Sequence, residues 1–304
     1  MQIERSWRST HSYLGYAQVD MGVGYGLLAA LCWGVGDYAI TTLARQVGSA
    51  KSLLVIQAFS LLSWICLLSL FPRGAGGGTY IWAIALIAGA FHVLGLVCTY
   101  RAFEIGTLSF VSPIASSFAI VTALLFVVSG SAPAPIALAG TVLLVAGVAV
   151  VSRSTSHDGP ITLRGVPEAI LSAIAFGIMF WLIDSYVRGP LGDVVPLILL
   201  KVMATTYAGV YASRAKNEEA SIPLLSGRSL SLGLAAALLD TGAWIAFLFG
   251  CKLENGAVVT AVASLFSAFT VLLAWIFLRE RLNRAQWVGV AVILFGVLIV
   301  SLPK

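Results

Sequence analysis

Charged side chains are scarce in this sequence: only 10% of its 304 residues are Asp, Glu, Lys or Arg. A soluble globular domain carries about 25% charged residues, because its surface faces water. Hydrophobic residues instead make up 59% of the chain, and its mean hydropathy is +0.97. Most of the surface must therefore face something other than water, which excludes a soluble globular protein and indicates an integral membrane protein.

Residue types that carry enzyme and metal chemistry are also few. The histidines are scattered and the cysteines lack C-x-x-C spacing, so we expect no metal site and interpret the cysteines as small buried hydrophobic residues. No nucleotide-binding loop and no nucleophile–base set stands out, so we expect no cofactor, no enzyme and no primary pump. The residues concerned are Cys32, Cys66, Cys98, Cys251, His11, His92 and His157.

The net charge of +5 is small and is spread over the predicted loops. Nucleic-acid-binding proteins neutralise phosphates with dense basic patches, and the sequence has no such run. Residues 1–20 carry Arg5, Arg8 and Asp20 and lack the apolar core of a signal peptide. We therefore predict a polar N-terminal tail, no nucleic-acid partner, and a lipid bilayer around the rest of the chain.

Apolar stretches separated by charged or turn-forming breaks follow this tail. A transmembrane helix needs about 20 apolar residues, so ten such helices use roughly two-thirds of a chain of this length. The pattern predicts an all-α integral membrane fold with ten transmembrane helices and short loops. We place the spans at about 22–43, 52–71, 80–101, 107–128, 136–152, 165–187, 193–212, 230–251, 256–278 and 285–302.

The two halves of the chain repeat the same landmarks. Glu104 and Glu254, each in a Glu-x-Gly break, lie 150 positions apart. Gly140 and Gly289, each the start of a Gly-x6-Gly run, lie 149 apart, which indicates one unit used twice. Because each half holds an odd number of spans, the second half must enter the membrane in the opposite orientation. We predict a tail at 1–20, a first five-helix repeat at 21–152, a loop at 153–164 and a second, inverted repeat at 165–304.

Further landmarks resemble those of a known family. Each half opens with Ala-x-x-aromatic-Gly, at Ala30 to Gly34 and at Ala173 to Gly177. An acidic turn around Glu280, reading LRERL, precedes the last helix, and the first half lacks it. Over roughly residues 22–302 the chain resembles EamA-type members of the drug/metabolite transporter superfamily. The resemblance implies ten helices in two repeats, transport of a small solute, and a multi-pass place in the cell inner (plasma) membrane.

Five predicted helices each carry a polar side chain at similar depth. Asp240 and His92 lie at the middle of the eighth and third predicted spans, which correspond in the two halves. Lys201 and Gln57 occupy corresponding positions of the seventh and second spans, 144 residues apart. Asp37 lies just past the middle of the first span. Ionisable groups inside a membrane are costly, so each is a candidate for solute binding or proton coupling. Two alternatives stay open: Asp240 and Lys201 neutralise each other in the core, and His92 is a hydrogen-bonded packing residue rather than a proton relay.

Aromatic side chains share helix faces with the two acids. Trp33 precedes Asp37 by four residues and Trp244 follows Asp240 by four, a spacing that places each pair on one helix face. Ring faces attract ammonium groups and a carboxylate supplies the counter-charge, so we expect a cationic or zwitterionic organic solute. The sixth span adds two further candidates, Phe180 and Trp181.

These features favour a secondary transporter, more specifically an exporter, of an amino acid, a metabolite or a cationic drug, with a midplane site and alternating access. A passive facilitator of the same solutes is the main alternative. A membrane enzyme acting on lipid, or a scaffold, fits less well, because the polar groups cluster at midplane. A monomer suffices for a path between two halves, and a homodimer stays open.

The loop Lys and Arg residues favour an N-terminus outside, whereas the resemblance implies both termini inside; we follow the resemblance.

Overall fold

A computed structural model of the protein describes residues 2–70, 76–130, 163–214, 226–253 and 265–300, together with positions 74, 139, 143, 146, 259, 262 and 263. Nearly all of these residues are helical, and no strand occurs among them. The all-α prediction is therefore confirmed for this part of the chain. The fifth predicted span and the connecting loop lie largely outside the described residues.

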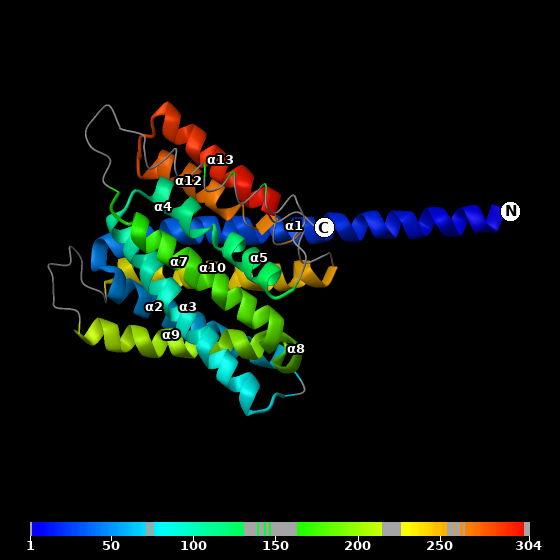
Figure 1. Ribbon diagram of the computed structural model, residues 1–304, viewed down its shortest axis with the longest axis horizontal. Helices are drawn as coiled ribbons and strands as arrows, with labels where there is room; N and C mark the ends of the chain where they lie inside the picture. Colours follow the sequence, from blue (N-terminus) through cyan, green and yellow to red (C-terminus); the bar gives the residue numbers. More distant parts are fainter. Residues whose placement is uncertain are drawn as a thin grey trace.

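The helices form a bundle in which the chain runs back and forth (Figure 1). Among the described residues, seven segments are long and apolar enough to cross a membrane, and they match predicted spans one to four and six to eight. Shorter apolar helices occupy the ninth and tenth. This arrangement indicates a multi-pass membrane protein. The helices are α1 (Gln2–Val47), α2 (Ser49–Leu67), α3 (Thr79–Ile105), α4 (Leu108–Ala115), α5 (Phe118–Val128), α7 (Val166–Leu182), α8 (Arg188–Leu191), α9 (Val194–Arg214), α10 (Gly227–Leu253), α12 (Phe266–Phe277) and α13 (Arg284–Val300), with a 3-10 turn η1 (Leu68–Leu70) and a π turn η2 (Ile183–Val187).

Two helices run further than the hydrophobic pattern predicts. The first begins at Gln2 rather than near residue 22, so the α1 backbone continues beyond the apolar stretch (Figure 1). The sixth passes from α7 through the π turn η2 into α8 and ends at Leu191. Hydropathy finds the apolar part of a helix and not its end, because the hydrogen-bond ladder continues into polar residues.

The fourth predicted span is two helices, α4 and α5, rather than one. Pro113 lies inside α4 and lacks the N–H that would bond to the preceding turn. The hydroxyls of Ser116 and Ser117 donate to the carbonyls of Pro113 and Ile114 at 2.9 and 2.5 Å, where α4 ends. These side-chain bonds compete with the helical ladder and allow the break between the two helices.

Helix packing follows two matching sets of partners. α1 lies against α10 and α12, α7 lies against α3, α4 and α5, and α2 lies against α9. Large side chains such as Trp64, Tyr100 and Phe103 are fully buried between them. The packing surrounds the centre of the bundle with helices from both halves of the chain.

A glycine brings α1 and α12 into close contact. A Cβ at Gly34 would lie 2.5 Å from Phe269 Cβ and 2.8 Å from the Phe266 carbonyl oxygen, closer than side chains approach in proteins. The Thr270 hydroxyl also lies 3.4 Å from the Gly34 carbonyl and 3.0 Å from that of Phe266. The small residue therefore sets how near α12 comes to α1.

The same contact recurs between α7 and α5. A Cβ at Gly177 would collide with Val121 and lie 2.9 Å from the Phe118 carbonyl oxygen. The Thr122 hydroxyl lies 3.0 Å from the Gly177 carbonyl and 3.2 Å from that of Phe118. Gly177 is the glycine of the second Ala-x-x-aromatic-Gly motif, as Gly34 is of the first, so the motif marks a close helix crossing in each half.

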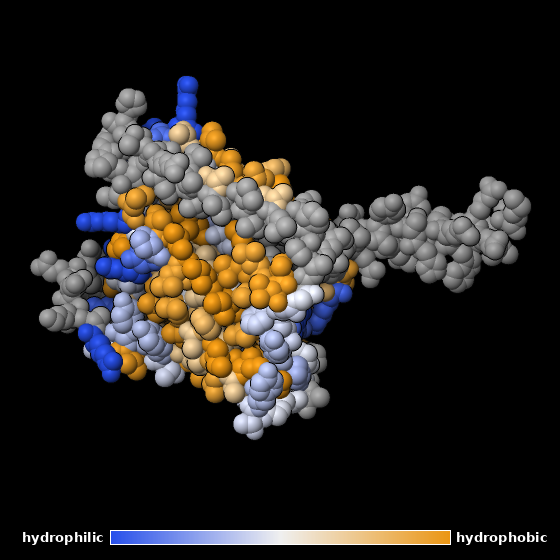
Figure 2. Space-filling model, viewed as in Figure 1, coloured by the Kyte–Doolittle hydropathy of each residue, from blue (hydrophilic) through white to orange (hydrophobic). Residues whose placement is uncertain are grey.

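The outer surface is apolar across its middle (Figure 2). Large side chains such as Leu62, Ile65 and Ile276 are at least half exposed, at 57%, 53% and 50%. Soluble proteins rarely expose apolar surface this extensive, whereas lipid tails cover it without cost. The surface therefore agrees with a protein that lies in a bilayer.

Candidate functional site

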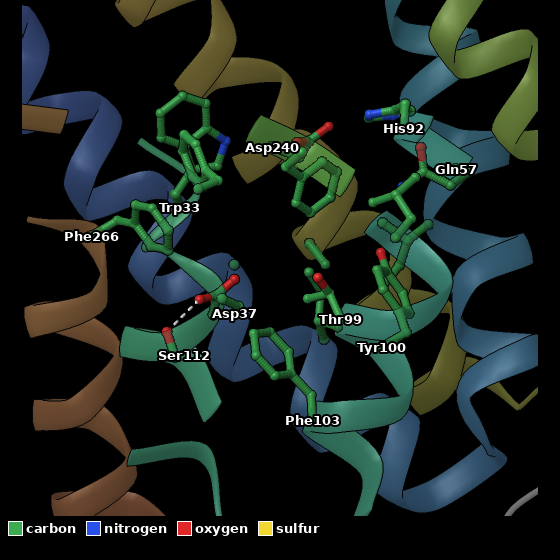
Figure 3. Close-up of a pocket in the computed structure, with 18 of the residues that line it drawn as sticks. Trp33, Asp37, Gln57, His92, Thr99, Tyr100, Phe103, Ser112, Asp240 and Phe266 are labelled. Atoms are coloured by element: carbon green, nitrogen blue, oxygen red, sulfur yellow. Dashed lines mark hydrogen bonds between the residues drawn. The ribbon is translucent and has the colours of Figure 1, made fainter. Parts of the chain in front are cut away.

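A cavity of about 150 Å³ lies in the bundle (Figure 3). Its lining comes from α1, α2, α3, α4, α5, α7, α9, α10 and α12, so both halves of the chain contribute. An apolar cavity of about this size holds a molecule such as benzene. The cavity is therefore large enough for one small organic solute in this conformation.

The cavity gathers most of the candidate residues that the sequence predicted. Asp240, His92 and Asp37 line it although they lie on three different helices. The structure therefore brings together side chains that only their predicted depth had linked. The other candidates in the lining are Lys201, Gln57, Trp33, Trp244 and Phe180.

Trp181 is the one candidate that is not part of this lining. Its indole Nε1 donates to Ser129 Oγ at 3.1 Å, and its ring lies edge-on to that of Tyr186. Consecutive residues on an α-helix point about 100° apart. The side chain of Phe180 therefore enters the cavity while that of its neighbour Trp181 turns toward the end of α5.

Asp37 presents its carboxylate to the cavity from α1. Its Oδ2 accepts hydrogen bonds from the hydroxyls of Ser112 and Thr270 at 3.0 and 3.1 Å, the first of which is drawn in Figure 3. Within the described part of the chain, none of the ion pairs involves Asp37. Hydroxyl groups stabilise a carboxylate but do not neutralise it. Asp37 can therefore pair with a cation that enters the cavity.

Asp240, in contrast, forms an ion pair with Lys201. The Lys201 Nζ lies 2.6 Å from Asp240 Oδ2 and 3.2 Å from Gln57 Oε1, and Ser60 donates to the same Oδ2 at 2.9 Å. The Lys201 side chain is only 3% exposed, so its charge needs a partner. The pairing corresponds to the alternative in which these two charges neutralise each other, yet both residues still line the cavity.

His92 lines the cavity without a hydrogen-bond partner for either ring nitrogen within the described structure. The residue is 5% exposed, and its ring lies 5.8 Å from that of Phe176 between centroids. Of the two interpretations of His92 from sequence, the hydrogen-bonded packing residue does not correspond to this geometry. Its two nitrogens are free to contact a molecule in the cavity.

A connected set of aromatic rings forms much of the remaining wall. The Trp33 and Trp244 rings meet edge to face at 5.4 Å, and Trp33 also lies 6.1 Å from Phe266. Phe180 stacks on Trp244 at 5.9 Å and on Phe118 at 4.9 Å. These rings come from five helices, so the wall exists only in the folded bundle. Such a wall suits an organic cation or an aromatic solute.

Several lining residues were missed from the sequence. Ser112 was detectable as part of a small polar stripe with Ser109 and Ser116, but such a stripe is equally typical of a packing seam. The aromatic members carried no distinguishing signal, because packing and lining residues are both apolar in a membrane protein. The missed residues include Thr99, Tyr100, Phe103, Phe118 and Phe266.

A second polar cluster, the Glu280 knot, lies where α1 ends and consists of Arg45, Leu108, Ser109 and Glu280. Glu280 accepts hydrogen bonds from the Leu108 and Ser109 N–H groups at 3.0 and 2.9 Å and from the Ser109 hydroxyl at 2.7 Å. Its carboxylate therefore caps α4 from the loop before α13. Arg45 donates to Glu280 Oε1 at 3.0 Å and to the Gly106 carbonyl at 2.8 Å, which adds the end of α3.

A cavity with charged and aromatic walls inside a lipid-facing helical bundle is typical of a membrane transporter. Residues 163–302 match the model of the EamA-like transporter family. The match covers less than half of the chain, and over these residues it confirms the predicted resemblance to EamA-type transporters. The family indicates a membrane transporter of small solutes.

Solved structures agree with this fold. One, titled "Crystal structure of protein", aligns with 92% of this chain and 98% of its own at a TM-score of 0.55 and 15% sequence identity. At this identity the likeness concerns the fold alone. No curated protein matches the sequence.

Proposed function

We propose that this chain is a secondary transporter that exports a small organic amine by alternating access. The candidates are an amino acid, a metabolite or a cationic drug, and the path runs through the cavity across a plasma membrane. The observation that carries the proposal is Asp37, a carboxylate in an aromatic cavity with hydroxyl partners and no cation partner among the described residues. An entering ammonium group supplies the missing counter-charge.

The charge balance of the cavity supports a cationic substrate group. Lys201 and Asp240 neutralise each other, so the pair presents no net charge to the solute. The carboxylate of Asp37 remains, close to Trp33 on the same helix and with Phe266 also in the wall. Rings and carboxylate together attract an ammonium group and disfavour an anion.

Two inverted five-helix repeats fit this packing. α1 contacts α12 through Gly34 as α7 contacts α5 through Gly177, and in each contact a threonine hydroxyl lies within 3.4 Å of the glycine carbonyl. The α1–α10 and α3–α7 pairs correspond in the same way when the halves are exchanged. Repeats of this kind rock against each other around a central site, which is the basis of alternating access.

The substrate group is tested by replacing Asp37 with Asn. We expect purified Asp37→Asn protein to bind phenethylamine about 30-fold more weakly or worse, because loss of one partner of a buried charge pair costs about 2–5 kcal/mol. Ligand-dependent thermal stabilisation measures the affinity. Asp184→Asn is the matched control, because Asp184 lies outside the cavity lining and its side chain is 55% exposed. Equal affinities of Asp37→Asn and wild-type protein would contradict the proposal.

Coupling is tested separately with phenyltrimethylammonium, whose fixed charge prevents leakage through lipid. In proteoliposomes, uptake that follows an imposed pH gradient supports a proton-coupled exporter. Uptake that follows only the concentration gradient of phenyltrimethylammonium identifies a passive facilitator. Vesicles that contain the Asp37→Asn variant show the background flux.

A further inference from the structure

His92 is a buried polar side chain that the structure leaves without a partner. Neither Nδ1 nor Nε2 has a hydrogen bond in the described structure, and the residue is 5% exposed. Buried polar groups in proteins are almost always hydrogen-bonded, and an exception signals an occupant such as water or a ligand. The open side of His92 is the cavity, which it lines.

The polar neighbours of His92 are already engaged elsewhere. Lys201 is held by Asp240 and Gln57, at 2.6 and 3.2 Å from its Nζ. The ring of Phe176, whose centroid lies 5.8 Å from that of His92, offers no hydrogen-bond donor or conventional acceptor. A neutral imidazole carries one donor nitrogen and one acceptor nitrogen. His92 can therefore both donate to and accept from a group in the cavity.

His92 and Asp37 are separated across the cavity. In Figure 3 they lie on different sides of it, with Asp37 beside Trp33 and Phe266 and with His92 beside Gln57. The space between them is bounded mainly by apolar and aromatic side chains and totals about 150 Å³. A cavity of that volume accommodates about one aromatic ring.

We propose that the transported solute is a single-ring monoamine with a hydrogen-bonding group at its far end, and that His92 recognises that group. This inference rests on the proposed function, in which Asp37 binds the amine. The ring lies against the aromatic wall, and a hydroxyl or carbonyl group at the other end meets the unpartnered imidazole. A site that offers a buried hydrogen-bonding group rejects analogues that cannot use it.

The test compares two probes that differ only in one hydroxyl group, phenethylamine and tyramine. We expect wild-type protein to bind tyramine about fivefold to tenfold more tightly, the effect of one net hydrogen bond. In His92→Phe the ratio of the two affinities falls to about one, and in His92→Gln part of the preference returns because the amide also donates and accepts. Isothermal titration of purified wild-type, His92→Phe and His92→Gln protein with each of the two amines measures all six affinities.

Thr205→Val is the matched control. The Thr205 hydroxyl is also buried without a hydrogen bond in the described structure, but Thr205 is not among the cavity-lining residues. This variant should keep the wild-type ratio. Equal wild-type affinities for the two amines would show that His92 contacts only water and would overturn the inference. If neither amine binds wild-type protein, the proposed function itself fails. If both His92→Phe and His92→Gln still prefer tyramine, another residue recognises the tyramine hydroxyl.

Discussion

At the scale of single residues, two aspartates in one cavity have different partners. Asp240 accepts from Lys201 at 2.6 Å, whereas Asp37 accepts only from the hydroxyls of Ser112 and Thr270 among the described residues. Each aspartate has a tryptophan four residues away, so spacing alone treats them alike. This difference in partners is why we propose Asp37, rather than Asp240, as the residue that binds the solute.

The Lys201–Asp240 pair is expected to be non-additive on mutation. Lys201→Met or Asp240→Asn alone leaves one buried charge without a partner and should lower stability by about 3–5 kcal/mol. The double variant leaves no unpaired charge and should lose less than the sum of the two single losses. Unfolding of the purified protein in a detergent series measures this coupling. Additive losses would show that the two side chains do not depend on each other.

At the scale of helices, the Glu280 knot joins several helix ends at one end of the bundle. It joins the ends of α1 and α3, the start of α4 and the loop before α13. Arg188 lies 143 positions after Arg45, the separation of Gly34 and Gly177, yet it pairs with Asp193 and Asp184 close by in sequence. The knot therefore has no counterpart built on Arg188, and we expect the path to open and close at the knot.

Glu280→Gln should loosen this closure, because the neutral amide loses the ion pair with Arg45 and caps α4 more weakly. We expect Phe103→Cys, at a cavity-lining position near the end of α3, to react faster with an impermeant thiol reagent from the knot side when Glu280→Gln is also present. The comparison uses protein with its native cysteines replaced, in cells and in inverted vesicles.

Glu104→Gln is the control for that experiment. It removes an ion pair of 2.9 Å with Arg101, near the end of α3, without touching the knot. Its labelling rate should equal that of the parent. A Glu280→Gln rate no faster than this control would show that the knot stabilises α4 but does not close the path.

At the scale of the whole molecule, the described basic residues are unevenly divided between the two ends of the bundle. The end that contains the knot carries Arg45, Lys51, Arg101, Arg164, Arg214, Arg228, Arg279, Arg281 and Arg284, whereas Arg5, Arg8, Arg188 and Lys252 lie toward the other end. Figure 1 places the start of α1 and the end of α13 toward that other end. The positive-inside rule associates the basic end with the cytoplasm.

The charge distribution therefore predicts that the knot faces the cytoplasm and that both termini lie outside. This opposes the orientation that the family resemblance implies. A phosphatase reporter fused after Lys304 should then be active, and a cytoplasm-dependent fluorescent reporter at the same position should be dark. The reverse pattern would restore the orientation expected from the resemblance.

Much of the fold was predictable because hydrophobic length sets where helices cross a membrane. Seven described segments coincide with predicted spans, and the Ala-x-x-aromatic-Gly motifs mark two close helix crossings. The break after Pro113 was less predictable, because a proline within a membrane helix either bends it or is tolerated. The end of α8 was missed because the π turn at Ile183–Val187 leaves no hydropathy signal.

The candidate site was partly predictable for a related reason. A charged residue at midplane is costly, so Asp37, Asp240, Lys201 and His92 stood out against the apolar sequence. Thr270 did not, because hydroxyl groups are common. Glu280 stood out as part of the acidic turn before the last helix, but the sequence did not indicate that its carboxylate reaches α4. Trp181 was predicted together with its neighbour Phe180 but is not part of this cavity lining, because one step along a helix turns a side chain by about 100°.

The sequence by itself determined that this protein lies in a membrane, that most of its helices fall where they do, and which costly polar groups enter the bilayer. Composition and periodicity are enough for this, because burial in lipid acts on each segment separately. Only the tertiary structure decided that Lys201 pairs with Asp240 rather than Asp37, that His92 has no hydrogen-bond partner among the described residues, and that Glu280 reaches α4. Those outcomes depend on distances between residues far apart in sequence, and packing alone sets these distances.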